Sequence, residues 1–198
     1  MPVVINGDTG ITTPSVALPG STSGTATISP PAVAGTTTIT TPTNTGTMVT
    51  GGPAFAAYLS GSQTVTSGTI TLAQLATELF DTASCFNNTN ATVGGIPAYA
   101  FLPNVAGYYQ VNFAVMAAGA TTNTYAGAYI YKNGTAISRN SVPGWSATNG
   151  DSNTTRIVYM DGATDYLQFY GQSVGTGAQT LISGESRTLA TAAFIRPA

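Results

Sequence analysis

The stretch YQVNFAV, residues 109–115 of a 198-residue chain, decides the fold. Its large apolar side chains, Tyr109, Val111, Phe113 and Val115, alternate with smaller or polar ones. A period of two is typical of a β-strand that is buried on one face and exposed on the other. The stretch therefore predicts a half-buried strand in a protein whose core is built from such strands.

Short strand-like segments with turn residues between them continue toward the end of the chain. Asn133-Gly134 follows one of them, and this pair supplies the positive φ angles that a tight hairpin requires. Short strands separated by turns rich in Gly, Asn and Pro indicate a β-sandwich or barrel. The segments that we predict as strands are 128–131, 156–160, 166–170 and 189–195.

The spacing within residues 71–80 conflicts with this all-β interpretation. The apolar residues recur three or four positions apart, which is the spacing of an amphipathic helix. Periodicity alone therefore predicts a short helix here, formed by Leu72, Leu75, Ala76, Leu79 and Phe80.

Residues 1–52 have a different composition from residues 53–198. No charged residue occurs between Asp8 and Glu78, and residues 20–47 are rich in Thr, Ser, Gly and Pro. Short β-prone pieces in this region, divided by Pro or Gly, cannot bury a core by themselves. The region is either a flexible linker or mucin-like stalk, or an arm that neighbouring molecules hold, and we expect the arm. The β-prone pieces are 25–28, 36–40 and 47–50, and the candidate anchoring residues are Val3, Val4, Ile5, Ile11, Val16 and Leu18.

Charged residues make up only 6% of the chain, against about 25% in an average soluble domain. The five basic residues are spread singly and the net charge is −2, so the clustered cations that bind phosphate are missing and we expect no nucleic-acid partner. No run approaches the roughly 18 apolar residues of a membrane span. The first residues lack the features of a secretory signal, so we expect neither membrane insertion nor classical export.

Catalytic machinery is not expected either. The chain contains no histidine, which removes the usual activation of a Ser or Cys nucleophile and the usual zinc sites. Glu78 and Asp81 are close in sequence, and we interpret them as solvated or turn-capping carboxylates. Lys132 is the only lysine and no phosphate-binding glycine loop precedes it. The single cysteine, Cys85, cannot form an intramolecular disulfide and is interpreted as a small buried hydrophobe. We expect no catalytic residues, cofactor or metal.

A series of short motifs in residues 53–198 resembles, in the same order, the globular head domain of complement C1q, which is related in fold to tumour necrosis factor. The most distinctive is the stretch 106–113, in which a glycine turn leads into an alternating aromatic strand. Each motif alone is weak, but the shared order is specific for the fold. The motifs are 53–59, 80–82 with 86–87, 101–103, 106–113, 131–134, 160–167 and 193–195.

The resemblance implies a ten-stranded jelly roll that assembles as a tight trimer. It also implies a strand at residues 69–75, and we favour this over the helical spacing. Some members bind calcium near the trimer apex; Asp161 and Asp165 are the nearest acidic pair here, and we interpret them as turn caps. Trp145 lies in a predicted loop, where it could either stack on sugars or pack at a trimer interface, and we favour the interface because aromatic residues are enriched there. The candidate residues for the trimer interface or the surface of the knob are Tyr58, Tyr109, Trp145 and Tyr166.

Phage versions of this domain are the more similar ones. They resemble the chain at residues 105–111 and in its Arg-Pro-Ala end, and residues 32–47 resemble a repeat of fibre and decoration proteins. The expected function is that of a homotrimeric capsid decoration or cement protein of a tailed bacteriophage. Residues 1–52 would bind the major capsid protein or another virion protein on the outer surface of the head, after assembly in the host cytoplasm. The alternatives are a tail fibre or tail-tip protein whose tyrosines and Trp145 bind a host receptor, a binding module outside a virion, and, last, an enzyme.

Overall fold

The computed structural model describes residues 16–19, 25–28, 51–143 and 149–198. The chain divides into two compact units, Met1–Gly46 and Thr47–Ala198. In the first unit, β1 (Val16–Pro19) pairs antiparallel with β2 (Thr25–Ile28). This pairing confirms the β-prone piece at 25–28. The pieces at 36–40 and 47–50 lie outside the described residues.

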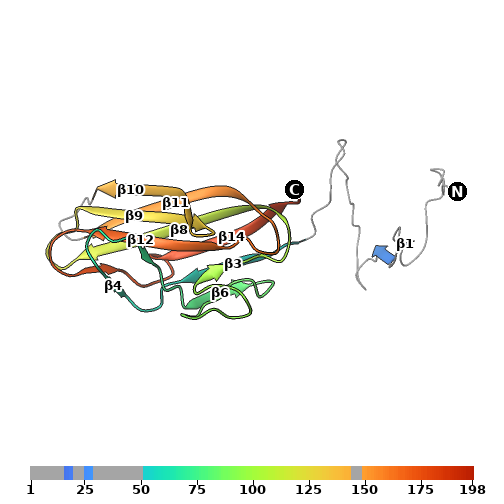
Figure 1. The fold of residues 1–198 in the computed structure, drawn as a ribbon, viewed down its shortest axis with the longest axis horizontal. Helices are drawn as coiled ribbons and strands as arrows, with labels where there is room; N and C mark the ends of the chain where they lie inside the picture. Colours follow the sequence, from blue (N-terminus) through green and yellow to red (C-terminus); the bar gives the residue numbers. More distant parts are fainter. Residues whose placement is uncertain (1–15, 20–24, 29–50, 144–148) are drawn as a thin grey trace, which may run out of the picture. The chain divides into compact units, whose positions relative to one another are not determined.

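The second unit is a sandwich of two antiparallel sheets (Figure 1). One sheet has the order β4-β13-β8-β14-β3-β6, with β11 paired along the free side of β8; the other has the order β10-β9-β12-β5, with β7 also paired to β12. The strands are β3 (Ala54–Tyr58), β4 (Gln63–Val65), β5 (Thr71–Leu72), β6 (Thr77–Asp81), β7 (Ala100–Phe101), β8 (Gly107–Gly119), β9 (Tyr125–Lys132), β10 (Thr135–Pro143), β11 (Asn149–Met160), β12 (Leu167–Val174), β13 (Gln179–Leu181) and β14 (Leu189–Arg196).

Strand β8 has the alternation that its sequence predicts. Every second residue from Gly107 to Gly119 is buried, and those between are partly or fully exposed. The buried side chains face an aromatic centre in which the Phe55 ring stacks on Phe86 at 4.4 Å and on Phe101 at 4.8 Å between centroids. Large rings in offset contact contribute beyond the area that they bury. This cluster therefore holds the two sheets together.

Residues 71–80 form no helix. Strand β5 occupies two residues of the predicted strand 69–75, so that prediction is right in kind but too long. Beyond it, Ala73 and Leu75 are buried, whereas Leu79 and Phe80 on β6 are 44% and 49% exposed. A helix would have placed Leu75, Leu79 and Phe80 on one buried face. Instead, Leu75 lies in the connection between β5 and β6 and enters the core, whereas Leu79 and Phe80 lie on β6 and remain exposed, which is why the spacing misleads.

The Asn133-Gly134 hairpin forms as predicted. Its two turn residues have φ values of 50° and 77°, and Thr135 pairs with Lys132 directly across the turn. The predicted strands at 156–160 and 189–195 are confirmed within β11 and β14, although β11 begins seven residues earlier, and the strand predicted at 166–170 overlaps β12 from Leu167 onward. In the part of the chain that the structure describes, no helix is long and apolar enough to cross a membrane.

Candidate functional site

The outward side of the sheet β6-β3-β14-β8-β11 is the first surface that could bind another molecule. One register row crosses it from Phe80 through Ala56, Thr191 and Asn112 to Thr155, which shows that residues from all five strands share the face. We call it the neutral face. Its outward residues are Phe80, Tyr58, Thr191, Ala193, Ile195, Tyr108, Gln110, Asn112, Ala114, Thr155, Ile157 and Tyr159.

Charge is almost absent from the neutral face. Strands β3 and β8 contain no charged residue. Asp151 pairs with Met116 toward one end of β8, where Arg187 lines a hollow beside it, and Arg196 pairs with Tyr108 at the other end, so the charges on this face are confined to its two ends. A face of this kind loses little solvation when a second protein surface covers it, because few charges must leave water.

Apolar side chains remain exposed on this face. Ile157 is 60% exposed, Ile195 40% and Phe80 49%. Tyr108, Ile157, Ile195 and Arg196 line a shallow hollow of about 230 Å³. The guanidinium carbon of Arg196 lies 5.2 Å from the centre of the Tyr108 ring, so the charged group stacks on an aromatic wall. Exposed apolar patches on a soluble domain mark interaction surfaces.

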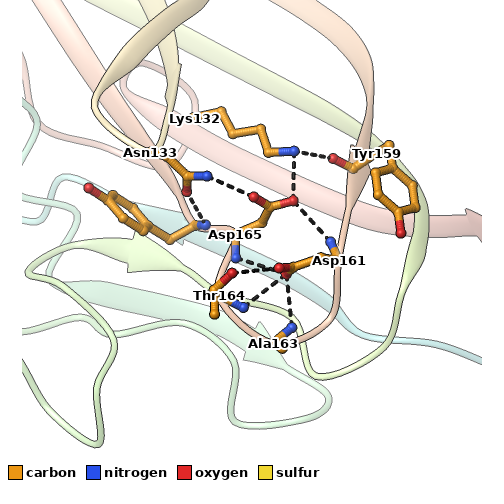
Figure 2. Close-up of polar contacts among 8 residues, drawn as sticks. Lys132, Asn133, Tyr159, Asp161, Ala163, Thr164 and Asp165 are labelled. Carbon is orange, nitrogen blue, oxygen red and sulfur yellow. Dashed lines mark hydrogen bonds and ion pairs between the residues drawn. The ribbon is translucent and has the colours of Figure 1, made fainter.

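A cluster of polar contacts fixes the end of the sandwich next to the hollow (Figure 2). Lys132 Nζ lies 2.7 Å from Asp165 Oδ2 and also donates to the Tyr159 carbonyl at 2.7 Å. Asn133 Nδ2 donates to Asp165 Oδ1 at 2.7 Å. Asp161 Oδ1 accepts three backbone N–H groups, from Ala163, Thr164 and Asp165. We call this cluster the hairpin clasp, because it ties the β9–β10 turn to the β11–β12 turn.

Both carboxylates of the hairpin clasp are held in their charged form. The hydrogen bonds from the Thr164 hydroxyl and from backbone N–H groups lower the pKa of Asp161. Burial raises the pKa of Asp165, but the bonds from Lys132 and Asn133 outweigh it, so the net pKa is lowered. These bonds confirm that the two aspartates cap a turn. Among the described residues no three acidic or Cys side chains come close enough together to hold a metal ion.

The other chemically notable side chains have structural partners. Asp81 accepts backbone N–H groups from Ala83 and Phe86, which confirms it as a turn cap. Burial, and then the charge of Asp81, raise the pKa of Glu78, a shift that the sequence did not indicate. Cys85 is 2% exposed and therefore packs as a small hydrophobe, as predicted, and burial raises the pKa of its thiol.

The residues predicted for a trimer interface have separate fates. Tyr58 is half-buried on the neutral face. Tyr166 is half-buried at the hairpin clasp, where its backbone N–H donates to Asn133. The prediction for Tyr109 is wrong: the side chain is fully buried, because its hydroxyl reaches the Val105 carbonyl at 2.8 Å and its polar end needs no solvent. Trp145 lies outside the described residues.

The candidate anchoring residues lie in the first unit. Val16 and Leu18 belong to β1, and Val3, Val4, Ile5 and Ile11 lie outside the described residues. Their role and the boundary between 1–52 and 53–198 stay predictions. Sequence reasoning missed Ile157, although the signal was present: Val158 and Met160 alternate with Ile157 and Tyr159 along β11, so one pair had to face outward.

Comparison with known proteins identifies the class of fold. The structure is similar to murine APRIL at pH 8.5, with a TM-score of 0.50 and 8% identity over 72% of this chain and 98% of that chain. It also resembles Eiger TNF from S. frugiperda (TM-score 0.48, 10% identity, 74% and 95% covered) and the globular domain of zebrafish complement 1qA (0.46, 9%, 74% and 99%). No protein-family model and no curated protein matches the chain.

The second unit is therefore an all-β jelly roll of the type found in tumour-necrosis-factor-like domains. The likeness to APRIL and the two antiparallel sheets establish the fold class that the sequence motifs predicted.

Proposed function

We propose that the chain assembles as a homotrimer through the neutral face. The observation that carries this proposal is a sheet face with almost no charge, an apolar hollow at one end and Phe80 exposed on its edge strand. Tumour-necrosis-factor-like and C1q-like domains are typically homotrimers. In a ring of three, one patch of each copy meets a different patch of the next, so a hollow and a protruding ring on one face are compatible with closure.

We further propose that the trimer is a decoration or cement protein on the outer surface of a phage head. The support is the resemblance of residues 105–111 to phage members and the Thr-, Gly- and Pro-rich composition of residues 1–52. The arm would bind the major capsid protein or another virion protein, adding strands or apolar contacts to it. The jelly roll would project as a knob, and the arms would stabilise the head by joining adjacent capsomers.

The mass of the full-length protein in solution tests the assembly. A homotrimer has three times the chain mass of 20.0 kDa, which light scattering after size-exclusion chromatography resolves from a monomer or dimer. A monomer at micromolar concentration contradicts the trimer proposal.

Antibody labelling of whole virions, viewed by electron microscopy, tests the location. Label over the head supports the decoration role, whereas label confined to the tail tip replaces it with the receptor-binding alternative. Deletion of residues 2–50 should leave a trimer that no longer binds virions. A truncated protein that still decorates particles contradicts the role of the arm.

A further inference from the structure

The outward side of the second sheet carries a group of tyrosines. Tyr125, Tyr129 and Tyr131 occupy alternate outward positions of β9, and Tyr170 of β12 pairs with Tyr129 in register. Burial of Tyr129 is nearly complete, whereas the other three rings are half-buried. We call these four residues, with Gln168 and Gln172 of β12, the tyrosine face.

Hydrogen bonds hold two rings of the tyrosine face, Tyr129 and Tyr170, in place. Tyr129 donates its hydroxyl to Gln172 Oε1 at 2.6 Å, and Tyr170 donates to Gln168 Oε1 at 3.2 Å. Each glutamine is itself held, because Gln172 Nε2 donates to the Gly68 carbonyl and Gln168 Nε2 to the Ala98 carbonyl. Rings that are held before a ligand arrives lose little conformational entropy on binding.

Gly127 allows two of the rings to lie across the sheet. A Cβ atom at this position would come within 2.8 Å of the Tyr129 ring and within 3.2 Å of the Tyr125 ring. Only a residue without a side chain leaves that space. The rings therefore cover the backbone of β9 rather than stand away from it.

Of the three half-buried rings, Tyr131 and Tyr170 lie in contact with each other. Their centroids are 4.4 Å apart and their planes are inclined by 41°. At the bulge of β10, where Ala136 pairs with Tyr131, a separate hollow of about 280 Å³ is lined by residues 136–139, which include Arg139 and none of the tyrosines. This volume is close to the lower end of ligand pockets, roughly 300 Å³.

The chemistry of the tyrosine face limits what can bind there. Strands β9, β10 and β12 contain no acidic residue, and their two cations are Lys132, which is paired with Asp165, and Arg139. One available cation does not attract a polyanion. Aliphatic side chains are scarce as well, in contrast to the neutral face. Aromatic rings with fixed amides and hydroxyls remain, and these groups suit a ligand with apolar C–H faces and neutral hydroxyl groups.

We propose that the tyrosine face is a binding site for neutral glycan chains. A pyranose ring packs its C–H face on Tyr131 and Tyr170, and its hydroxyl groups bond to the remaining lone pairs and N–H groups of the glutamines and to Arg139. The site belongs to the sheet opposite the neutral face, so this inference holds whether or not the protein is a trimer and wherever it is located.

The test uses full-length protein with ¹³C-labelled tyrosine rings and three neutral probes, maltohexaose, cellohexaose and xylohexaose, at millimolar concentration. NMR should show shifts of the Tyr125, Tyr131 and Tyr170 signals with at least one probe, whereas Tyr108 and Tyr159 of the neutral face serve as internal controls. An anionic polysaccharide, polygalacturonate, is tested in parallel. The absence of shifts with all three neutral probes overturns the proposal, and so does binding to polygalacturonate alone. Equal shifts of the tyrosine signals on the neutral face also overturn it.

Variants separate stacking from other contacts. Tyr131→Ala should weaken binding by roughly tenfold, the effect of losing one good aromatic contact, whereas Tyr131→Phe keeps the ring and should bind as the parent does. Gly127→Ala, which displaces the Tyr129 and Tyr125 rings, should also weaken binding. Val93→Ala, at an exposed position outside both sheets, is the matched control. A lower molecular mass of Tyr131→Ala would instead identify the tyrosine face as the assembly interface and overturn the proposal.

Discussion

The two outer faces of the sandwich differ in how their side chains are satisfied. On the tyrosine face the large side chains bond to one another and to backbone carbonyls, and the Tyr129 ring is 5% exposed without any partner molecule. On the neutral face Ile157 is 60% exposed within the part of the chain that the structure describes. A surface whose side chains already form hydrogen bonds within the chain is stable in contact with water and is available to bind a ligand. A surface with uncovered aliphatic groups gains free energy when another protein covers it.

The largest expected effect is a loss of stability of the whole sandwich, on which both faces depend. Phe55 stacks on Phe86 and Phe101 between the sheets, and Phe55→Ala should lower the free energy of unfolding by about 3–5 kcal/mol. Chemical denaturation followed by circular dichroism measures it. Val93→Ala, at a 53% exposed site, should change little. A loss below 1 kcal/mol for Phe55→Ala would contradict this account of the core.

The second effect separates the faces. Ile157→Asp places a charge at the apolar hollow, and burying it in an interface would cost several kcal/mol. The variant should be monomeric by light scattering while its circular dichroism spectrum remains that of the parent. Val93→Asp adds the same charge off the face and should keep the mass of the parent. An unchanged mass for Ile157→Asp would show that the neutral face is not the interface.

The third effect concerns the hairpin clasp. It stabilises the sheets of both faces, because it joins β9 to β11 and β12. Asp165→Asn removes the ion pair with Lys132 and weakens the bond from Asn133. The expected loss is about 1.5–3 kcal/mol, typical of hydrogen bonds to a charged group. Urea denaturation at neutral pH measures it, and Asp151→Asn, at an exposed carboxylate on β11, is the control.

Acid should reveal the same contribution. The folded pKa values of Asp161 and Asp165 are lowered, so the stabilisation is present above the unfolded carboxylate pKa of about 3.9 and is lost as pH falls through the folded values. The urea midpoint should therefore fall between pH 5 and pH 2. In Asp165→Asn the fall should be smaller, and an equal fall would place the acid-sensitive groups elsewhere.

The smallest effect is confined to the tyrosine face. Tyr170→Phe keeps the ring but removes the hydroxyl that donates to Gln168. The unfolding free energy should fall by about 0.5–1.5 kcal/mol, with the oligomer mass unchanged. A change in mass would show that the two faces are not independent.

The sequence predicted those parts of the fold in which neighbouring residues alone determine the local backbone conformation or the direction of the side chains. The alternation of β8 and the positive φ angles at Asn133-Gly134 follow from local chemistry. The start of β11 escaped prediction because Ser152 and Thr154 face inward and bond to β10 instead of packing in the core. The prediction that Tyr109 lies at an interface was wrong for a related reason, because its hydroxyl donates to the Val105 carbonyl and the side chain is buried. The alternation along β11 shows that either Ile157 and Tyr159 or Val158 and Met160 must face outward, but which pair does so depends on strand order, which local patterns do not contain.

The bonds of the hairpin clasp also bear on chemical ageing. In an asparagine followed by glycine, the glycine backbone nitrogen readily attacks the side-chain amide carbon and releases ammonia, and water then opens the cyclic imide to aspartate or isoaspartate. Asn133 precedes Gly134, but its amide donates to Asp165 and accepts from the Tyr166 N–H. Cyclisation must break both bonds, and its product would put a second carboxylate beside Asp165. The hydrogen bonds that stabilise this turn should therefore also slow the deamidation of Asn133 during storage.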